Sequence, residues 1–230
     1  MASVRSIADR LRRQLANVAS ILGLLPLYLL FMPDGYQYLV PVILWNNFMD
    51  DLDGVLAAKL GIRSRFGADL DNVCDAIAHT VFVMVVGMHY GGICAAVSLL
   101  ATTAIVIRVV SRIGPAGATG AGSPTNELIR HMLFVLLLAN LFGIGAAPFL
   151  VATFATHAVS MLLPHKLPYL LRSLAKSVTA VALLNVALVL AWLVPLATPV
   201  VAGAFVISYV CSLAVASTRA LLRAEAEAHV

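Results

Sequence analysis

Four aspartates in one short stretch are the residues of this chain best suited to chemistry. Asp50 and Asp53 are three positions apart and Asp71 and Asp75 are four apart, and residues 50–75 hold six of the chain's eleven acidic residues. On helices each pair shares one face, so two helices joined by a turn can point four carboxylates into one space. Hard oxygen ligands of this kind suit Mg²⁺, Mn²⁺ or Ca²⁺ rather than zinc. The stretch therefore predicts a divalent-cation site.

The segments that must position these aspartates are strongly apolar. The 230 residues are 61% hydrophobic and 11% charged, with a mean hydropathy of +0.97. A soluble domain usually carries about 25% charged residues, so we expect an all-α, polytopic bundle of membrane helices. Carboxylates at membrane depth are costly unless something neutralises them, which agrees with a bound cation.

The apolar runs predict about eight transmembrane helices in one domain, residues 17–230. They are expected at about 17–32, from 36, at 67–90 and 91–110, from 126, and at 147–163, 176–195 and 198–220. Residues 114–125 and 164–172, the latter with Lys166, are expected to form inner connections. Residues 1–16 combine apolar positions at helical spacing with arginines, which is typical of an amphipathic helix in the membrane interface.

The 15 lysines and arginines fall at segment ends on one side of this arrangement. The positive-inside rule then places both termini and the aspartates on the cytoplasmic side, and we expect a protein of the bacterial inner membrane. The sequence pI of 9.2 follows from that pattern, so the lipid bilayer is the expected partner and nucleic acid is not. The three cysteines lie in apolar segments and are interpreted as small core residues.

The aspartate stretch also carries a family pattern. The chain resembles the CDP-alcohol phosphatidyltransferases, whose signature is DxxDGxxAR, then about eight residues, then GxxxDxxxD. The matching positions are Asp50, Asp53, Gly54, Ala57, Gly67, Asp71 and Asp75. The signature arginine is replaced by Ala58. The resemblance implies a core of six membrane helices, to which the last two are an addition, and a homodimer.

The resemblance implies a transferase of phospholipid synthesis. A hydroxyl of a small polar alcohol attacks CDP-diacylglycerol, a phosphatidyl group is transferred, and CMP leaves. By the same resemblance two Mg²⁺ or Mn²⁺ ions are held by Asp50, Asp53, Asp71 and Asp75. Asp50 and Asp71 bridge the ions, and Asp75 is also the catalytic base.

The same resemblance implies a nucleotide site beside the aspartates. Its predicted members are Asn17, Ser20, Gly54, Ala57, Lys59, Ser64 and Gly67. The small residues among them are also explained by tight helix packing, and Asn17 by a helix cap. For the missing arginine, Lys59, Arg63 or Arg65 is expected to compensate.

Three arginines near the inner ends of the fourth and fifth spans are candidates for binding the acceptor: Arg108, Arg112 and Arg130. Anchoring by the positive-inside rule also explains them. The acceptor stays open among serine, inositol phosphate, glycerol phosphate and choline, because the sequence resembles different branches of the family in different places.

Other interpretations compete with the transferase. Intramembrane carboxylates also occur in cation transporters, and Ala58 would fit a catalytically silent family member. Among residues off the motif face, Asp51 is expected to face solvent or a supporting partner, and Asp69 to cap a helix or pair with Arg65. His79 and His157 are interpreted as core packing residues.

Overall fold

The computed structural model describes residues 2–113, 124–162 and 177–228, and every regular element in these ranges is a helix. The α-helices are α1 (Ala2–Leu24), α2 (Leu39–Lys59), α3 (Arg65–Tyr90), α4 (Gly92–Val110), α5 (Pro124–Phe142), α6 (Ala147–Leu162), α8 (Val178–Leu193) and α9 (Thr198–Ala228). Two 3₁₀ helices, η1 (Leu25–Phe31) and η2 (Gly35–Tyr38), join α1 to α2. The all-α prediction and the expected helix count are confirmed. The predicted inner connections at 114–123 and around Lys166 lie outside the described residues.

Most of these helices have the length and composition of membrane spans. Within the described residues, five stretches of 18 or more residues are apolar enough to cross a bilayer: Gln14–Phe31, Arg65–Tyr90, Gly92–Val110, Pro124–Phe142 and Thr198–Val215. Helices α6 and α8 are shorter apolar helices. Large apolar side chains such as Leu100, Leu183 and Val200 are exposed, as expected for an integral membrane protein whose outer surface contacts lipid.

The first helix differs in detail from the expected division at residue 16. Helix α1 runs from Ala2 to Leu24 without a break, so the predicted interfacial segment and the start of the first span belong to one helix. The α-helix gives way to η1 at Leu25, directly before Pro26, since proline cannot donate to the preceding turn. An interfacial position for residues 1–16 stays a prediction.

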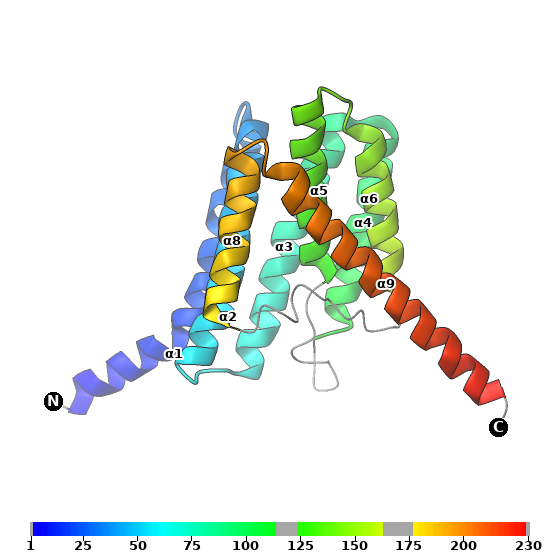
Figure 1. Cartoon of the computed structure of the whole chain (residues 1–230). Coiled ribbons are helices and arrows are strands. Elements are labelled where there is room, and N and C mark those ends of the chain that lie inside the picture. The colour runs from blue at the N-terminus through cyan, green and yellow to red at the C-terminus, as the bar shows by residue number, and fades with distance from the viewer. Residues whose placement is uncertain (1, 114–123, 163–176, 229–230) are drawn as a thin grey trace.

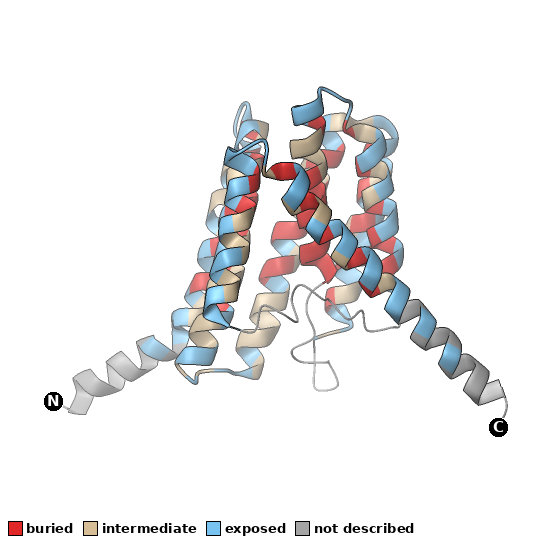
Figure 2. Cartoon of the chain, in the orientation of Figure 1, coloured by how far each residue is buried: buried red, intermediate tan, exposed pale blue. Residues whose placement is uncertain are grey.

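The motif-bearing helices α2 and α3 each contact several other helices of the bundle. Helix α2 contacts α1 and α8, α3 contacts α4 and α5, and α6 packs on α4 and α5, while α9 slants across α5 (Figure 1). Buried residues concentrate where α3 and α5 face the other helices (Figure 2). Phe82, Phe134 and Phe154 are among the largest fully buried side chains. Helix α1 begins, and α9 ends, at the end of the bundle that holds the α2–α3 turn (Figure 1).

Candidate active site

A short turn between α2 and α3 brings the two halves of the aspartate motif together. Helix α2 ends at Lys59, and Gly61 in the turn has a positive φ of 63°, a conformation that glycine adopts without strain. Ser64 caps α3 by accepting a hydrogen bond from the backbone N–H of Gly67 at 3.0 Å. The capped turn makes the chain reverse, so the end of α2 lies beside the start of α3.

Three aspartates form the centre of the site. One carboxylate oxygen from each of Asp50, Asp53 and Asp71 lies within 4.8 Å of the others. Asp53 is buried, and the other two are half-buried. Like charges so close together in a partly desolvated place repel strongly. Three carboxylates with no other ligand type are the donor set that Mg²⁺ or Mn²⁺ prefers, so the residues present fit a divalent cation.

Hydrogen bonds from other helices hold two of these carboxylates. Ser20 on α1 donates its hydroxyl to Asp53 Oδ2. Asn126 on α5 donates its amide to Asp50 Oδ2 at 2.8 Å. Ser20 is one of the predicted nucleotide residues, and its position beside Asp53 shows that α1 reaches the centre of the site. Asn126 was not predicted.

The fourth motif aspartate is buried, as Asp53 is, but lies farther from the α2–α3 turn. Asp75 is 5% exposed and comes one turn after Asp71 on α3. It is not part of the group of three, and its Oδ1 lies 3.9 Å from Nε2 of His79. The other ring nitrogen of His79, Nδ1, lies 2.9 Å from Thr125 Oγ1 on α5. His79 is thus the hydrogen-bonded core histidine that the sequence indicated, and its contact with Thr125 joins α3 to α5 next to Asp75.

The predicted nucleotide residues meet where α1, the turn and α3 converge. A Cβ atom placed on Gly67 would lie 3.1 Å from Ser64 Oγ and 3.2 Å from Asn17 Oδ1. The glycine therefore permits a close approach of three segments, as the packing interpretation requires. Gly54 differs, because a Cβ atom there would meet nothing within 4 Å and the residue is exposed. The space beside Gly54 is open to a ligand.

The basic residues around the turn are arranged unequally. Lys59 and Arg63 are exposed, as is Ala58 at the position of the signature arginine, whereas Ala57 is half-buried. Arg65 is held in place, because its Nε contacts Asp69 at 3.2 Å and its Nη2 donates to the backbone carbonyl of Arg112 at 3.3 Å. The predicted pairing of Asp69 with Arg65 is confirmed.

The three candidate acceptor arginines lie in different environments. Arg108 and Arg112 are half-buried near the end of α4. Arg130 is 7% exposed, and its guanidinium contacts Glu127 Oε1 at 3.1 Å and Asn47 Oδ1 at 2.9 and 3.1 Å. It also lies 5.8 Å from the ring centroid of Phe205 on α9. Arg130 thus has several internal partners, and a role in binding the acceptor stays a prediction for all three.

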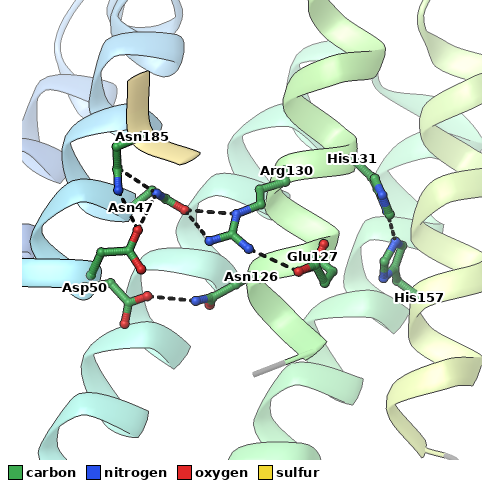
Figure 3. Close-up of polar contacts among 9 residues, drawn as sticks. Asn47, Asp50, Asn126, Glu127, Arg130, His131, His157 and Asn185 are labelled. Atoms are coloured by element: carbon green, nitrogen blue, oxygen red, sulfur yellow. Dashed lines mark hydrogen bonds and ion pairs between the residues drawn. The ribbon is translucent and has the colours of Figure 1, made fainter. Parts of the chain in front are cut away.

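Sequence analysis missed a set of amide side chains around Arg130. Asn185 on α8 donates to Asp51 Oδ2 at 2.6 Å and accepts from Asn47 Nδ2 at 3.0 Å. Figure 3 shows Asn47 between Asn185 and Arg130, with Asn126 reaching Asp50 next to them. Asp51 has the supporting partner that its off-motif position predicted. The sequence signal for Asn47 and Asn185 is that they interrupt apolar runs, whereas Asn126 follows Thr125 and precedes Glu127 and has no such signal.

A second buried polar group joins α5, α6 and α9. Nδ1 of His131 lies 2.8 Å from Nε2 of His157 (Figure 3), and the ring of Tyr209 stacks on His157 with the centroids 4.6 Å apart. The Tyr209 hydroxyl donates to Ser160 Oγ at 2.7 Å. His157 is therefore a packing residue, as predicted, but it is not a lone one.

Comparison with known proteins adds one finding to this geometry. A family model described as CDP-alcohol phosphatidyltransferase matches residues 13–210. This range contains the aspartate cluster, the turn and the amide side chains around Arg130. A comparison with curated proteins gave no match.

Proposed function

The chain belongs to the CDP-alcohol phosphatidyltransferase family, and from that premise we propose that it transfers the phosphatidyl group of CDP-diacylglycerol to a small polar alcohol. Membership supports transfer from a CDP-linked alcohol in general. The single observation that carries the proposal is the cluster of Asp50, Asp53 and Asp71 within 4.8 Å. It lies beside the open space at Gly54, where a nucleotide diphosphate can approach the helices.

The reaction replaces a phosphoanhydride bond with a phosphoester bond. The hydroxyl oxygen of the acceptor attacks the phosphorus that carries the diacylglycerol. The bond from that phosphorus to the bridging oxygen breaks, and CMP leaves with this oxygen. The hydroxyl proton goes to a carboxylate, for which we propose Asp75, because it is the motif aspartate outside the cluster of three. A base so placed contributes about 10²–10⁴-fold to the rate.

The other motif residues have binding and orienting roles in this proposal. Asp50, Asp53 and Asp71, with Asp75 at their side, are the residues that would hold two Mg²⁺ or Mn²⁺ ions. When bound, such ions neutralise the diphosphate and the charge that develops during transfer. Ser20 orients Asp53 through its hydrogen bond.

The nucleotide is proposed to bind over the small residues of the motif. Gly54 and Ala57 leave room on α2, while Gly67 at the start of α3 lies close to Asn17 and Ser64. Exposed cations at the turn then reach the diphosphate, and Lys59 is one of them. The proposal keeps Arg108, Arg112 and Arg130 as candidates for the acceptor.

A groove between α2 and α8 supports a lipid substrate. Its volume is about 530 Å³, and most of the side chains that line it are apolar, including Trp45, Phe48, Val186 and Trp192. Asp51 and Asn185 provide its polar part. A cavity of this size, lined mainly by apolar side chains, is typical of a small-molecule site. We propose that it takes an acyl chain of the CDP-lipid while the diphosphate lies at the cluster.

Release of CMP tests the proposal directly. Purified protein in lipid nanodiscs is mixed with CDP-diacylglycerol and Mg²⁺, and serine, inositol phosphate, glycerol phosphate and choline are offered separately. CMP and one phospholipid product are expected with one of these acceptors, and neither with the Asp71→Asn variant. The absence of CMP with every acceptor would support a silent family member. Metal-dependent cation flux into liposomes would instead support a transporter.

The setting of the reaction completes the proposal. We infer that the protein acts in the bacterial inner membrane with both termini and the active site in the cytoplasm, because the lysines and arginines follow the positive-inside rule. The α2–α3 turn, the start of α1 and the end of α9 lie at one end of the bundle (Figure 1), which agrees with this orientation. A homodimer stays a prediction of the family resemblance.

A further inference from the structure

Side chains from three helices form a continuous chain of polar contacts next to the aspartate cluster, half-buried on α2 and α8 and buried on α5. We call it the polar ladder, and its members are Asp51, Asn185, Asn47, Arg130 and Glu127, of which Figure 3 labels all but Asp51. It begins on α2 and α8 and ends on α5. Arg130 is a candidate acceptor residue, and Asp51 and Asn185 also line the groove proposed for the lipid. Asn47 and Glu127 have no part in the proposed reaction.

The ladder fixes the register of α5 against α2. Arg130 on α5 contacts Asn47 on α2 at 2.9 and 3.1 Å, and Asn126 on α5 contacts Asp50 on α2 at 2.8 Å. Asn47 precedes Asp50 by three residues, whereas Arg130 follows Asn126 by four, so each pair spans about one helical turn. The order of the contacting residues is therefore opposite on the two helices, as in an antiparallel pair. A shift of either helix by one turn therefore breaks both contacts at once.

Helix α8 determines which way the Asn47 amide points. Asn47 Nδ2 donates to Asn185 Oδ1 at 3.0 Å and to Asp51 Oδ2 at 3.3 Å, and Asn185 Nδ2 donates to Asp51 Oδ2 at 2.6 Å. An amide has one donating and one accepting end. Because its donor is held toward α8, Asn47 presents its carbonyl oxygen to Arg130.

At its α5 end the ladder contains an ion pair that is balanced in charge. Arg130 and Glu127 are 7% and 6% exposed, and their side chains are 3.1 Å apart. A buried charge with a partner at this distance is compensated internally, whereas removal of one partner is costly. The Arg130–Glu127 pair is therefore stable without a bound ligand and can hold the neighbouring side chains in place.

We propose that Asn126 is a positioning residue for Asp50, and that the polar ladder holds Asn126 in place from α8 through α2. The contact of Asn126 with Asp50 sets the direction of that carboxylate toward Asp53 and Asp71. The inference rests on the proposed function, because it takes Asp50 as a cation ligand. Hydrogen-bond partners of metal ligands typically contribute about 10–100-fold to metal affinity or activity.

Binding of Mn²⁺ to the full chain tests the inference without a measurement of turnover. Free Mn²⁺ is quantified by electron paramagnetic resonance in titrations of purified protein in nanodiscs. Asn126→Ala is expected to weaken binding by about 10–100-fold. Asn185→Leu, which breaks the ladder on α8, is expected to weaken binding in the same direction and by less. Asn140→Ala is the matched control, since Asn140 is an exposed residue at the far end of α5.

A kinetic measurement separates positioning from a loss of structure. In Asn126→Ala, excess Mn²⁺ is expected to restore most of the turnover, and Asn126→Ser, which keeps a donor, is expected to recover part of the affinity. If Asn126→Ala does not fold, Asn185→Leu decides. Wild-type affinity in the folded variants would overturn the inference alone, whereas a wild-type protein that binds no Mn²⁺ would overturn the proposed two-metal function.

Discussion

The aspartate cluster and the polar ladder are neighbours with opposite construction. The cluster consists of three acidic side chains from residues 50–71, and all of its ligating groups are carboxylates. The ladder combines an arginine, a glutamate and two amides with Asp51, drawn from residues 47–185, and its donors meet acceptors. The cluster therefore has like charges that a ligand can neutralise, whereas the polar groups of the ladder are hydrogen-bonded within the protein. The difference separates a binding site from its support.

The strongest test of this comparison removes a charge from the cluster. Asp71→Asn is expected to abolish CMP release and to weaken Mn²⁺ binding, because an amide lacks the negative charge and the second ligating oxygen of a carboxylate. The same change is expected to raise the unfolding temperature of the metal-free protein, since it relieves repulsion between like charges. Asp69→Asn, on the same helix but outside the group of three, is the control and should stay active. Full turnover of the wild type in EDTA would contradict the cluster's role.

The next effect separates Asp75 from the other three aspartates. Asp75→Asn is expected to lower turnover by about 10²–10⁴-fold and to leave the KM for CDP-diacylglycerol close to that of the wild type. The reason is that a base acts on the acceptor and not on the nucleotide. Steady-state kinetics with both substrates varied will measure this. Unchanged turnover would show that another group accepts the proton.

In the polar ladder, removal of one negative charge should lower the stability of the protein. Glu127→Gln leaves Arg130 buried without its charged partner, and breaking a buried pair costs about 3–5 kcal/mol. The unfolding temperature in nanodiscs is therefore expected to fall, in contrast to the rise predicted for Asp71→Asn. A Glu127→Gln variant that unfolds at the wild-type temperature would remove the distinction between the two regions.

The two regions also differ in how well the sequence predicts them. Asp50, Asp53 and Asp71 lie close together in the chain, and their spacing on two helices joined by a capped turn follows from local rules. Hydropathy likewise predicts where most helices begin and end. The contacts between side chains of the ladder do not follow from local rules, because partners such as Asn47 and Asn185 are 138 residues apart. Nothing in the local sequence marks either amide as the partner of the other, and the pair forms only because α8 packs on α2.

Other misses have the same origin. His157 looked like a lone packing residue because its partner His131 is on another helix, 26 positions away. Asn126 sits at the start of α5, where a polar residue is expected at a helix end, so nothing marked it as a partner of Asp50. Periodicity predicts which face of a helix is buried, but the identity of the facing helix depends on the whole bundle.

The exposed turn is where a single cation should matter for substrate binding. Lys59 and Arg63 are exposed, whereas Arg65 is engaged by Asp69 and the carbonyl of Arg112. Lys59→Ala or Arg63→Ala is therefore expected to raise the KM for CDP-diacylglycerol by about tenfold, as for loss of a hydrogen bond to a charged group. Arg65→Ala should have a smaller effect. Near-wild-type KM values for all three variants would exclude compensation by one residue.

The smallest effect is expected at Ala58, where the family signature has arginine. Ala58 is exposed at the end of α2, so an arginine fits there without displacing a neighbour. If Lys59 or Arg63 already contacts the diphosphate, Ala58→Arg adds a cation to a site that has one, and the KM for CDP-diacylglycerol should change little. The matched comparison is Ala58→Arg combined with Arg63→Ala, in which the new arginine should recover the affinity that the alanine removed. A large gain in Ala58→Arg alone, about tenfold or more as for one charge-assisted hydrogen bond, would show that the turn leaves the diphosphate without a cation.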